Sequence, residues 1–515
     1  MNVTSIVSKA FLARQKALRH HIQEGERLQQ QVLEYLISRG RATEYGRNHL
    51  FNTVTGYDSF VRNVPLNSYE QLKGDIDRMR HGERDVLWPG QVKWFAKSSG
   101  TTNDKSKFIP VTADGLRDIH YAGGRDSVAL YLKEHPKSRL FDGKALILGG
   151  SHAPNYNVAN SLVGDLSAIL VENINPLVNL VRVPKKPTAL LSDFEVKRDR
   201  IARETWQKNV TNLSGVPSWM MSVLTRVLEI SGKSCIDEVW PNLEVFFHGG
   251  VAFTPYRQQY RDIIHNPDMH YMETYNASEG FFGIQSEPDD PALLLMLDYG
   301  VFYEFIPMDE FSETELQHCP DHLHTVPLWG IETGKNYAIV ISTSCGLWRY
   351  VIGDTICFTQ KNPYKFVITG RTKHFINAFG EELIVDNAEK GLEYACEQTN
   401  AEVLEYTAAP IYMDNHARCR HQWLIEFSRE PQDIRQFAEL LDQKLQEINS
   451  DYEAKRYKSI TLQHLEIVTA RHDLFNDWLK NKGKLGGQHK IPRLSNSRDI
   501  IEEMIEMNST VNDEG

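Results

Sequence analysis

Hydrophobic and polar residues follow several different patterns along the chain. Over residues 4–38 the apolar positions recur at the spacing of a helix. From about residue 94 to 275, short apolar runs that end in glycine-containing loops alternate with helical segments. This order of strand, loop and helix predicts an α/β domain with its functional loops at the strand ends. The strands expected in this part are 144–150, 245–250 and 270–275, and the expected helices are 195–212, 217–231 and 254–265.

A series of short strands with few helices between them begins near residue 292, and it predicts an antiparallel β subdomain. These strands are 293–297, 301–306, 337–342, 350–357 and 366–369. After residue 371 the pattern becomes that of a small α+β unit, with helices at 386–398, 432–448 and 472–480 and strands at 403–413, 421–428 and 460–468. We therefore expect a large domain over residues 1–371 and a small domain over residues 372–515. The last dozen residues are polar and acidic, and we expect them to be frayed.

Size and composition narrow the class of protein. A chain of 515 residues exceeds what one hydrophobic core organises, so two or three domains are expected. The 41% hydrophobic and 24% charged content is typical of a soluble protein. No apolar run approaches the roughly 18 residues of a membrane helix. The formal net charge of -11 disfavours a nucleic-acid partner, because phosphate backbones favour basic surfaces. We therefore expect no nucleic-acid partner and no membrane partner. We also expect the protein to be a monomer.

The cysteines indicate the redox environment. There are six, widely spaced, and no two form a C-x-x-C pair. This density is far below that of a disulfide scaffold. Together with the absence of a secretory signal pattern at the N-terminus, it favours reduced thiols and a cytoplasmic location.

Small polar residues form the first candidate site, at Lys97-Ser-Ser-Gly-Thr-Thr102. Hydroxyl groups and a glycine allow several backbone N–H groups to converge on phosphate oxygens. The spelling differs from the G-x-x-x-x-G-K-[ST] loop of the common NTPases. Taken alone, a plain polar loop explains it equally well.

Two further motifs follow predicted strands. In Tyr275-Asn-Ala-Ser-Glu-Gly-Phe-Phe-Gly283, a tyrosine can stack on a base and Glu279 can hold Mg²⁺ against phosphates. In Tyr350-Val-Ile-Gly-Asp354, the acid can accept hydrogen bonds from ribose hydroxyls. Each motif singly is also compatible with an ordinary turn at a strand end.

The order and spacing of these motifs, with Gly249-Gly250 and Gly370-Arg371, resemble the adenylate-forming superfamily. The spellings Ser-Ser-Gly-Thr-Thr, Tyr-Asn-Ala-Ser-Glu-Gly and Gly487-Gln-His-Lys-Ile-Pro-Arg493 resemble, more narrowly, the Gretchen Hagen family of acyl-acid amido synthetases. The resemblance extends from about residue 5 to about residue 500. It implies an ATP-dependent, AMP-forming ligase that adenylates a carboxylic acid and transfers the acyl group to the amine of an amino acid, with ATP and Mg²⁺ as cofactors. It also implies that the large domain binds ATP and the acyl group, and that the small domain is mobile.

The resemblance also assigns roles to residues. Glu279 would bind Mg²⁺ and act in catalysis, and Asp354 would hold the ribose, with Arg371 near the same sugar or at the hinge. Lys490 would be the late lysine that supports adenylation, since a mobile ammonium can bridge a carboxylate and the α-phosphate. Lys482 and Lys484 are nearby rivals for that role. The remaining expected nucleotide contacts are Ser98, Ser99, Gly100, Thr101, Thr102, Gly249, Gly250, Tyr275 (against adenine), Asn276 and Ser278.

One stretch departs from the family pattern. Many plant members carry an Asp-Lys pair shortly after the hinge arginine, whereas this chain has Gly380-Glu381. This difference leaves open whether the hinge switches as in the plant members, and it argues against assuming a plant-hormone substrate.

Other functions are less compatible with the sequence. His318-Cys319-Pro-Asp321-His322-Leu-His324 resembles a set of zinc ligands, but no second ligand pair follows at a zinc-site spacing, which favours an exposed loop. No G-x-S-x-G elbow of a serine hydrolase is present. Two alternatives remain: an acyl-CoA ligase of the same superfamily, and a non-catalytic nucleotide-binding regulatory member.

Overall fold

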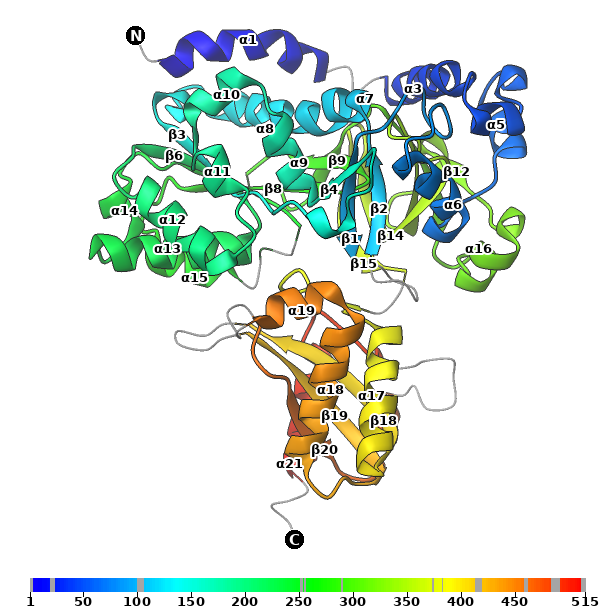
Figure 1. Ribbon diagram of the computed structural model, residues 1–515, viewed down its shortest axis with the longest axis vertical. Helices are drawn as coiled ribbons and strands as arrows, with labels where there is room; N and C mark the ends of the chain where they lie inside the picture. Colours follow the sequence, from blue (N-terminus) through cyan, green and yellow to red (C-terminus); the bar gives the residue numbers. More distant parts are fainter. Residues whose placement is uncertain are drawn as a thin grey trace. The chain divides into compact units, whose positions relative to one another are not determined.

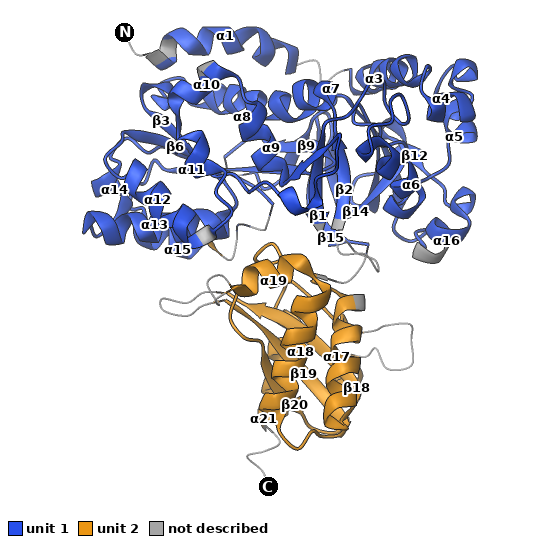
Figure 2. Ribbon diagram, in the orientation of Figure 1, with its two compact units in different colours: residues 1–98, 107–253, 257–372 blue, residues 99–106, 254–256, 373–515 orange. Residues whose placement is uncertain are grey.

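The structure, a computed structural model, describes residues 3–18, 24–99, 106–250, 253, 256–288, 290–372, 375–381, 383–412, 419–457, 462–482 and 491–510. The chain divides into two compact units (Figure 2). The larger comprises Met1–Ser98, Lys107–Phe253 and Arg257–Thr372, and the smaller comprises Ser99–Ser106, Thr254–Tyr256 and Lys373–Gly515.

Among the described residues, one sheet of 12 strands forms the centre of the larger unit (Figure 1). In spatial order its strands are β12 (Val326–Pro327), β11 (Val301–Pro307), β13 (Asn336–Thr343), β14 (Tyr350–Lys361), β15 (Tyr364–Arg371), β10 (Leu293–Leu295), β9 (Gly280–Gln285), β8 (His270–Ala277), β7 (Val245–His248), β6 (Val210–Gly215), β3 (Lys144–Ile147) and β5 (Arg182–Val183). The strands from β8 to β5 pair in parallel, and all pairs from β12 to β8 are antiparallel.

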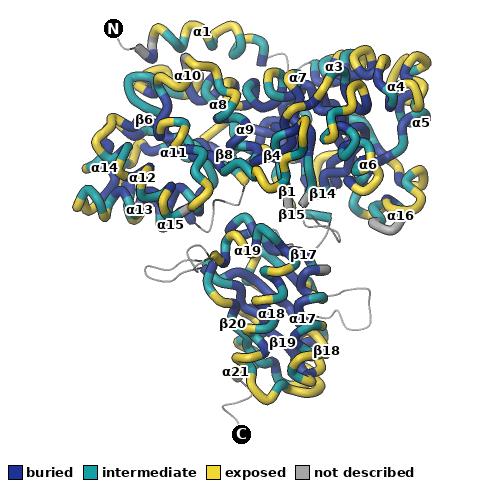
Figure 3. Tube along the Cα trace, in the orientation of Figure 1, coloured by how far each residue is buried: buried dark blue, intermediate teal, exposed yellow. Residues whose placement is uncertain are grey.

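The parallel half is covered by helices on both faces, with α8 (Tyr121–Glu134) on one side and α12 (Phe194–Thr205) and α13 (Pro217–Ser231) on the other (Figure 1). This arrangement explains the continuous apolar runs, because a parallel strand covered on both faces has no solvent side. All four residues of β7 are buried, and the central strands are dark in Figure 3. Because β3, β6, β7 and β8 are parallel, the loops that follow them leave the same edge of the sheet.

A second sheet in the larger unit has the order β2 (Ser106–Val111), β1 (Trp94–Ser99) and β4 (Leu162–Gly164). The other helices of this unit are α1 (Val3–Leu18), α3 (Gly25–Gly40), α4 (Glu44–Asn48), α5 (Tyr57–Asn63), α6 (Tyr69–Arg80), α7 (Ala113–Gly115), α9 (Leu166–Asn173), α10 (Pro176–Val181), α11 (Lys186–Ala189), α14 (Ile236–Val239), α15 (Arg257–Ile263) and α16 (Glu313–His318).

The smaller unit is an α+β structure. Its sheet has the order β18 (Glu402–Ile411), β19 (Arg420–Arg429) and β20 (Glu466–Ala470), beside a short pair formed by β16 (Phe375–Ile376) and β17 (Leu383–Ile384). Its helices are α17 (Val385–Thr399), α18 (Ile434–Ile448), α19 (Ser450–Arg456), α20 (Leu474–Asn481) and α21 (Asp499–Thr510). The predicted fold class, a large mixed α/β domain followed by a small α+β domain, is confirmed.

Some sequence predictions are confirmed and others need correction. The helix expected over 195–212 ends at Thr205, because Val210–Gly215 is a buried central strand. The helical pattern over 4–38 is confirmed where the structure describes it, in α1 and α3, while residues 19–23 lie outside the described residues. The strands after residue 292 are antiparallel, as predicted, and they extend the sheet of the parallel strands. Of the last dozen residues, which were expected to be frayed, 504–510 are helical, because Ile501 and Met504 are buried in an apolar cluster, and 511–515 lie outside the described residues.

None of the helices in the described part of the chain is both long and apolar enough to span a bilayer.

Candidate functional site

The turn between β8 and β9 carries a buried acid. Ala277 pairs with Gly280, so Ser278 and Glu279 form a two-residue turn at this end of the hairpin. Turn residues are usually solvated, yet Glu279 is only 6% exposed. A carboxylate withdrawn from water needs compensating donors or a cation, so its burial indicates a polar site at this edge of the sheet.

Asp354 receives hydrogen bonds from two strands. In the β14–β15 ladder it lies opposite Arg371, whose Nε donates to Asp354 Oδ1 over 2.7 Å. The hydroxyl of Tyr275 donates to Oδ2 over 2.5 Å, although 79 positions separate these residues in sequence. Asp354 is 8% exposed. The carboxylate thereby ties the end of β8 to the β14–β15 pair.

Tyr275 is held by packing as well as by this bond. Its ring lies 5.0 Å from the ring of Phe282 and 6.1 Å from that of Phe366, measured between centroids. Burial, followed by the nearby charge of Asp354, raises the pKa of Tyr275 well above its usual range. The phenol therefore stays protonated and acts as a donor to Asp354.

Tyr350, at the start of β14, points a polar atom into the same region. It is fully buried, and its hydroxyl has no hydrogen-bond partner among the described residues. Burial and then the charge of Glu279 raise its pKa, with smaller contributions from other groups that include Asp354. The residue therefore lies within electrostatic range of both acids. A buried hydroxyl without a protein partner can donate to a ligand or to a water molecule.

The glycines after β7 allow a close approach of two strand ends. A Cβ on Gly249 would lie 2.3 Å from the carbonyl oxygen of Thr274 and 3.0 Å from Oδ1 of Asn276. Gly250 has a φ of 86°, in the left-handed region that favours glycine. Larger residues would push the loop after β7 away from the loop after β8.

Four predicted residues, Tyr275, Glu279, Asp354 and Arg371, thus lie together, and Gly249 borders them through Asn276. Asn276 itself is exposed and Ser278 is half-buried, as is Ser98 in β1.

Other predicted residues fall elsewhere. Gly100, Thr101, Thr102, Lys484 and Lys490 lie outside the described residues, as does the side chain of Ser99. The rival Lys482 forms an ion pair with Glu503, at 2.8 Å in the smaller unit.

Sequence reasoning missed two residues inside motifs that it had singled out. One is Tyr350. The other is His248, the last residue of β7, which is 3% exposed and whose Nδ1 has no hydrogen-bond partner in the described part of the chain. Burial lowers the pKa of His248 to about 3, so its ring is neutral. Both are polar residues in otherwise apolar strands, and this position is the sequence signal that could have identified them.

The zinc-like stretch at 318–324 does not gather its donors. His318 ends α16, and a 3₁₀ turn at Pro320–His322 follows, with the histidines exposed. Within the described ranges, the groups of metal-ligand atoms that do converge lie at other positions.

Comparison with known proteins places the chain in a family. Residues 14–269 match the GH3 family N-terminal domain, residues 294–371 the GH3 family central domain, and residues 386–499 the GH3 family C-terminal domain.

Curated relatives cover nearly the whole chain. The indole-3-acetic acid-amido synthetase GH3.3 of Arabidopsis thaliana is 23% identical over 92% of this chain and 90% of its own length. The jasmonoyl–L-amino acid synthetase GH3.5 of Oryza sativa subsp. japonica is 24% identical over 92% and 93%.

Solved structures show the same fold. The AtGH3.15 acyl acid amido synthetase in complex with 2,4-DB superposes with a TM-score of 0.61 at 18% identity, covering 97% of this chain and 96% of that one. A 2-hydroxyisobutyryl-CoA ligase superposes with a TM-score of 0.56 at 12% identity, covering 97% and 92%. From the three matched domains and the nearly full-length relatives, we conclude that the chain belongs to the GH3 family, the family of the acyl acid amido synthetases.

Proposed function

We propose that this protein is an ATP-dependent, AMP-forming ligase that adenylates a carboxylic acid and joins the acyl group to the amine of an amino acid. The observation that carries the proposal is the cluster of Tyr275, Asp354 and Arg371 beside the buried Glu279, in a chain of the GH3 family. The relatives' names describe the same kind of reaction with different acids: indole-3-acetic acid, jasmonic acid and 4-substituted benzoates.

The residues fit a nucleotide. Each oxygen of Asp354 accepts one hydrogen bond and keeps a lone pair, which can accept from a ribose hydroxyl. Tyr350 supplies a buried hydroxyl without a partner in the described residues. Adenine would contact Tyr275. The ends of β7 and β8 approach each other closely at Gly249, so backbone groups of both strands are available to the nucleotide at this edge of the sheet. The other proposed nucleotide contacts here are Gly250, Asn276 and Ser278.

Phosphate binding would come from residues 98–102 and from Glu279. Ser98, Ser99, Gly100, Thr101 and Thr102 would donate hydroxyl and backbone N–H groups to phosphate oxygens. Glu279 would hold Mg²⁺, which prefers oxygen ligands and, when bound, neutralises phosphate charge. Burial suits this role, because a carboxylate shielded from water attracts a cation more strongly.

The reaction would need alignment more than acid–base chemistry. The substrate carboxylate attacks the α-phosphorus, the bond to pyrophosphate breaks, and the amine then displaces AMP from the acyl carbon. Lys490 would stabilise the charge that develops at the α-phosphate. The small domain, residues 372–515, would carry Lys490 and pivot near Arg371 between the two half-reactions, with water excluded from the acyl-adenylate.

The proposed substrates are a small carboxylic acid and an amino acid. The enzyme is proposed to be a monomer and to act in the cytoplasm. The cytoplasmic location agrees with six free cysteines. An acyl-CoA ligase is the second candidate, because a 2-hydroxyisobutyryl-CoA ligase shares the fold. A non-catalytic regulatory member is the third.

The deciding experiment measures pyrophosphate release with ATP and Mg²⁺ over a panel of indole, aryl, hydroxy and aliphatic acids. We expect release with some acid, and its loss in Glu279→Ala. Products are then trapped with an amino-acid mixture or with CoA: an amide supports the proposal, whereas a thioester would establish the acyl-CoA ligase. ATP binding without release with any acid would favour the non-catalytic nucleotide-binding member, and no ATP binding at all would refute the ligase.

A further inference from the structure

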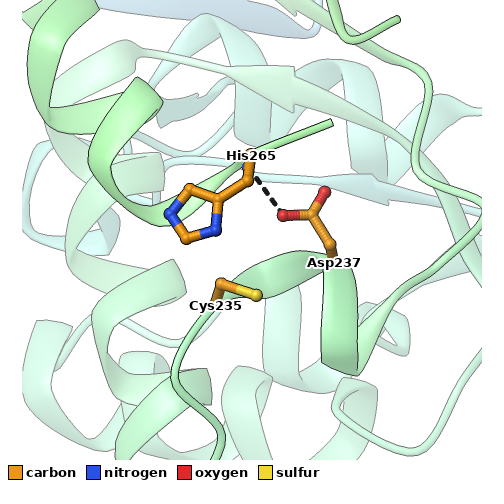
Figure 4. Close-up of side chains that lie close together, drawn as sticks. All are labelled: Cys235, Asp237 and His265. Carbon is orange, nitrogen blue, oxygen red and sulfur yellow. Dashed lines mark hydrogen bonds between the residues drawn. The ribbon is translucent and has the colours of Figure 1, made fainter. Parts of the chain in front are cut away.

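A second cluster of reactive side chains lies in the larger unit, at the start of α14 and in the loop after α15. Cys235 precedes α14, Asp237 lies within it, and His265 begins the turn that leads into β8. One donor atom from each of these residues lies within 4.8 Å of the other two. Figure 4 shows the three side chains converging on one point.

The histidine is oriented as a metal ligand would be. Its Nε2 lies 3.1 Å from the carbonyl oxygen of Asp262. A carbonyl oxygen only accepts, so Nε2 carries the hydrogen, and in the neutral ring the lone pair is on Nδ1. Figure 4 shows this second ring nitrogen on the side of the Cys235 sulfur. Donation of the far N–H to a backbone carbonyl is the usual way in which proteins fix the tautomer of a metal-binding histidine.

The carboxylate is fixed in the same manner. Asp237 accepts the backbone N–H of His265 over 2.6 Å and that of Asn266 over 3.1 Å. These bonds hold the acid against the histidine segment and leave one lone pair on each oxygen. Cys235 is 7% exposed, which places a thiol at the buried end of the cluster.

From these contacts we infer that Cys235, Asp237 and His265 form a zinc-binding site. A thiolate, an imidazole and a carboxylate are the three ligand types that zinc takes, whereas Mg²⁺ and Ca²⁺ take oxygen ligands. Tetrahedral zinc bonds place ligand atoms roughly 3.3–3.8 Å apart, so the three donor atoms, which lie within 4.8 Å of one another, would draw closer on binding. In the structure, the Cys235 thiol donates to Oε1 of Glu238 over 3.9 Å.

The site would clip two segments of the larger unit together. One segment follows α13, and the other enters β8, the strand that carries Tyr275. The inference is independent of the proposed function, because none of its three residues belongs to the nucleotide site.

The test uses the full-length, untagged protein. It is equilibrated with zinc in the presence of excess Mg²⁺, passed through a desalting column and assayed for metal, and cobalt is then substituted to look for the thiolate charge-transfer band in the near ultraviolet. We expect one zinc per chain and a cobalt–thiolate band in the wild type. Cys235→Ser and the exposed-site variant His265→Gln should each lose affinity about tenfold or more.

Cys319→Ser is the matched control, since Cys319 is the exposed cysteine of the histidine-rich stretch at 318–324. Its zinc content should equal that of the wild type. The inference is overturned by a wild type that retains no zinc, by zinc retained in Cys235→Ser or His265→Gln, or by zinc lost in Cys319→Ser. Circular dichroism of His265→Gln confirms that a loss of metal is not a loss of fold.

Discussion

Replacement of Asp354 by asparagine perturbs the contact that joins β8 to the β14–β15 pair. In the wild type, one carboxylate oxygen of Asp354 accepts a hydrogen bond from Tyr275 and the other accepts one from Arg371. An asparagine presents one oxygen and one NH₂ group. Whichever way the amide is turned, one of the two partners then meets a donor instead of an acceptor.

The magnitude follows from these two bonds. Hydrogen bonds to a charged group contribute about 1.5–3 kcal/mol each, and the one neutral bond that the variant retains contributes about 1 kcal/mol. The side chains are 11% exposed for Asp354 and 22% for Arg371, so solvent weakens the pair to some extent. We therefore expect Asp354→Asn to lower the unfolding free energy of the larger unit by about 2–3 kcal/mol.

Urea unfolding at neutral pH, followed by tryptophan fluorescence, measures this change as a lower midpoint with an unchanged slope. Asp309→Asn is the control, because the Asp309 carboxylate is 67% exposed and lies 3.5 Å from Lys335. Its effect should stay within about 0.5 kcal/mol. The reasoning is refuted if both variants unfold at the wild-type midpoint, since the bonds to Asp354 would then contribute nothing net. Under the proposed function, Asp354→Asn should also slow pyrophosphate release.

Three further predictions rest on buried groups. Tyr350→Phe should leave urea stability within about 1 kcal/mol, because its hydroxyl has no partner among the described residues, yet lower pyrophosphate release; a large loss of stability would contradict this. Glu304→Gln should cost about 3–5 kcal/mol in urea unfolding, because the Arg349 guanidinium, bonded over 2.9 Å, stays buried without its counter-charge. Burial lowers the pKa of Lys197 to about 8 from 10.5, so the charged form is disfavoured in the fold. Relative to Lys197→Met, wild-type stability should therefore rise, by up to about 3 kcal/mol, as the pH increases from 8 to 10.5, and a flat difference would refute this.

Local sequence determined the elements whose signals are contiguous. Helix α13 runs from Pro217 to Ser231, as predicted, because a proline at the first turn and the left-handed Gly232 after the last define its ends. The motifs at Tyr275 and Asp354 were also visible, since the residue types needed for nucleotide chemistry occur in short, ordered strings. The family followed from the same strings.

Only the tertiary structure decided which of these strings meet. The hydrogen bond from Tyr275 to Asp354 spans 79 positions and depends on the order of the strands in the sheet, which no local pattern specifies. The helical pattern of 195–212 was overridden in the same way, because a place inside a parallel sheet made Val210–Gly215 a strand. Cys235 and His265 likewise had no local signal in common. Their convergence follows from the packing of two loops, a long-range property of the fold.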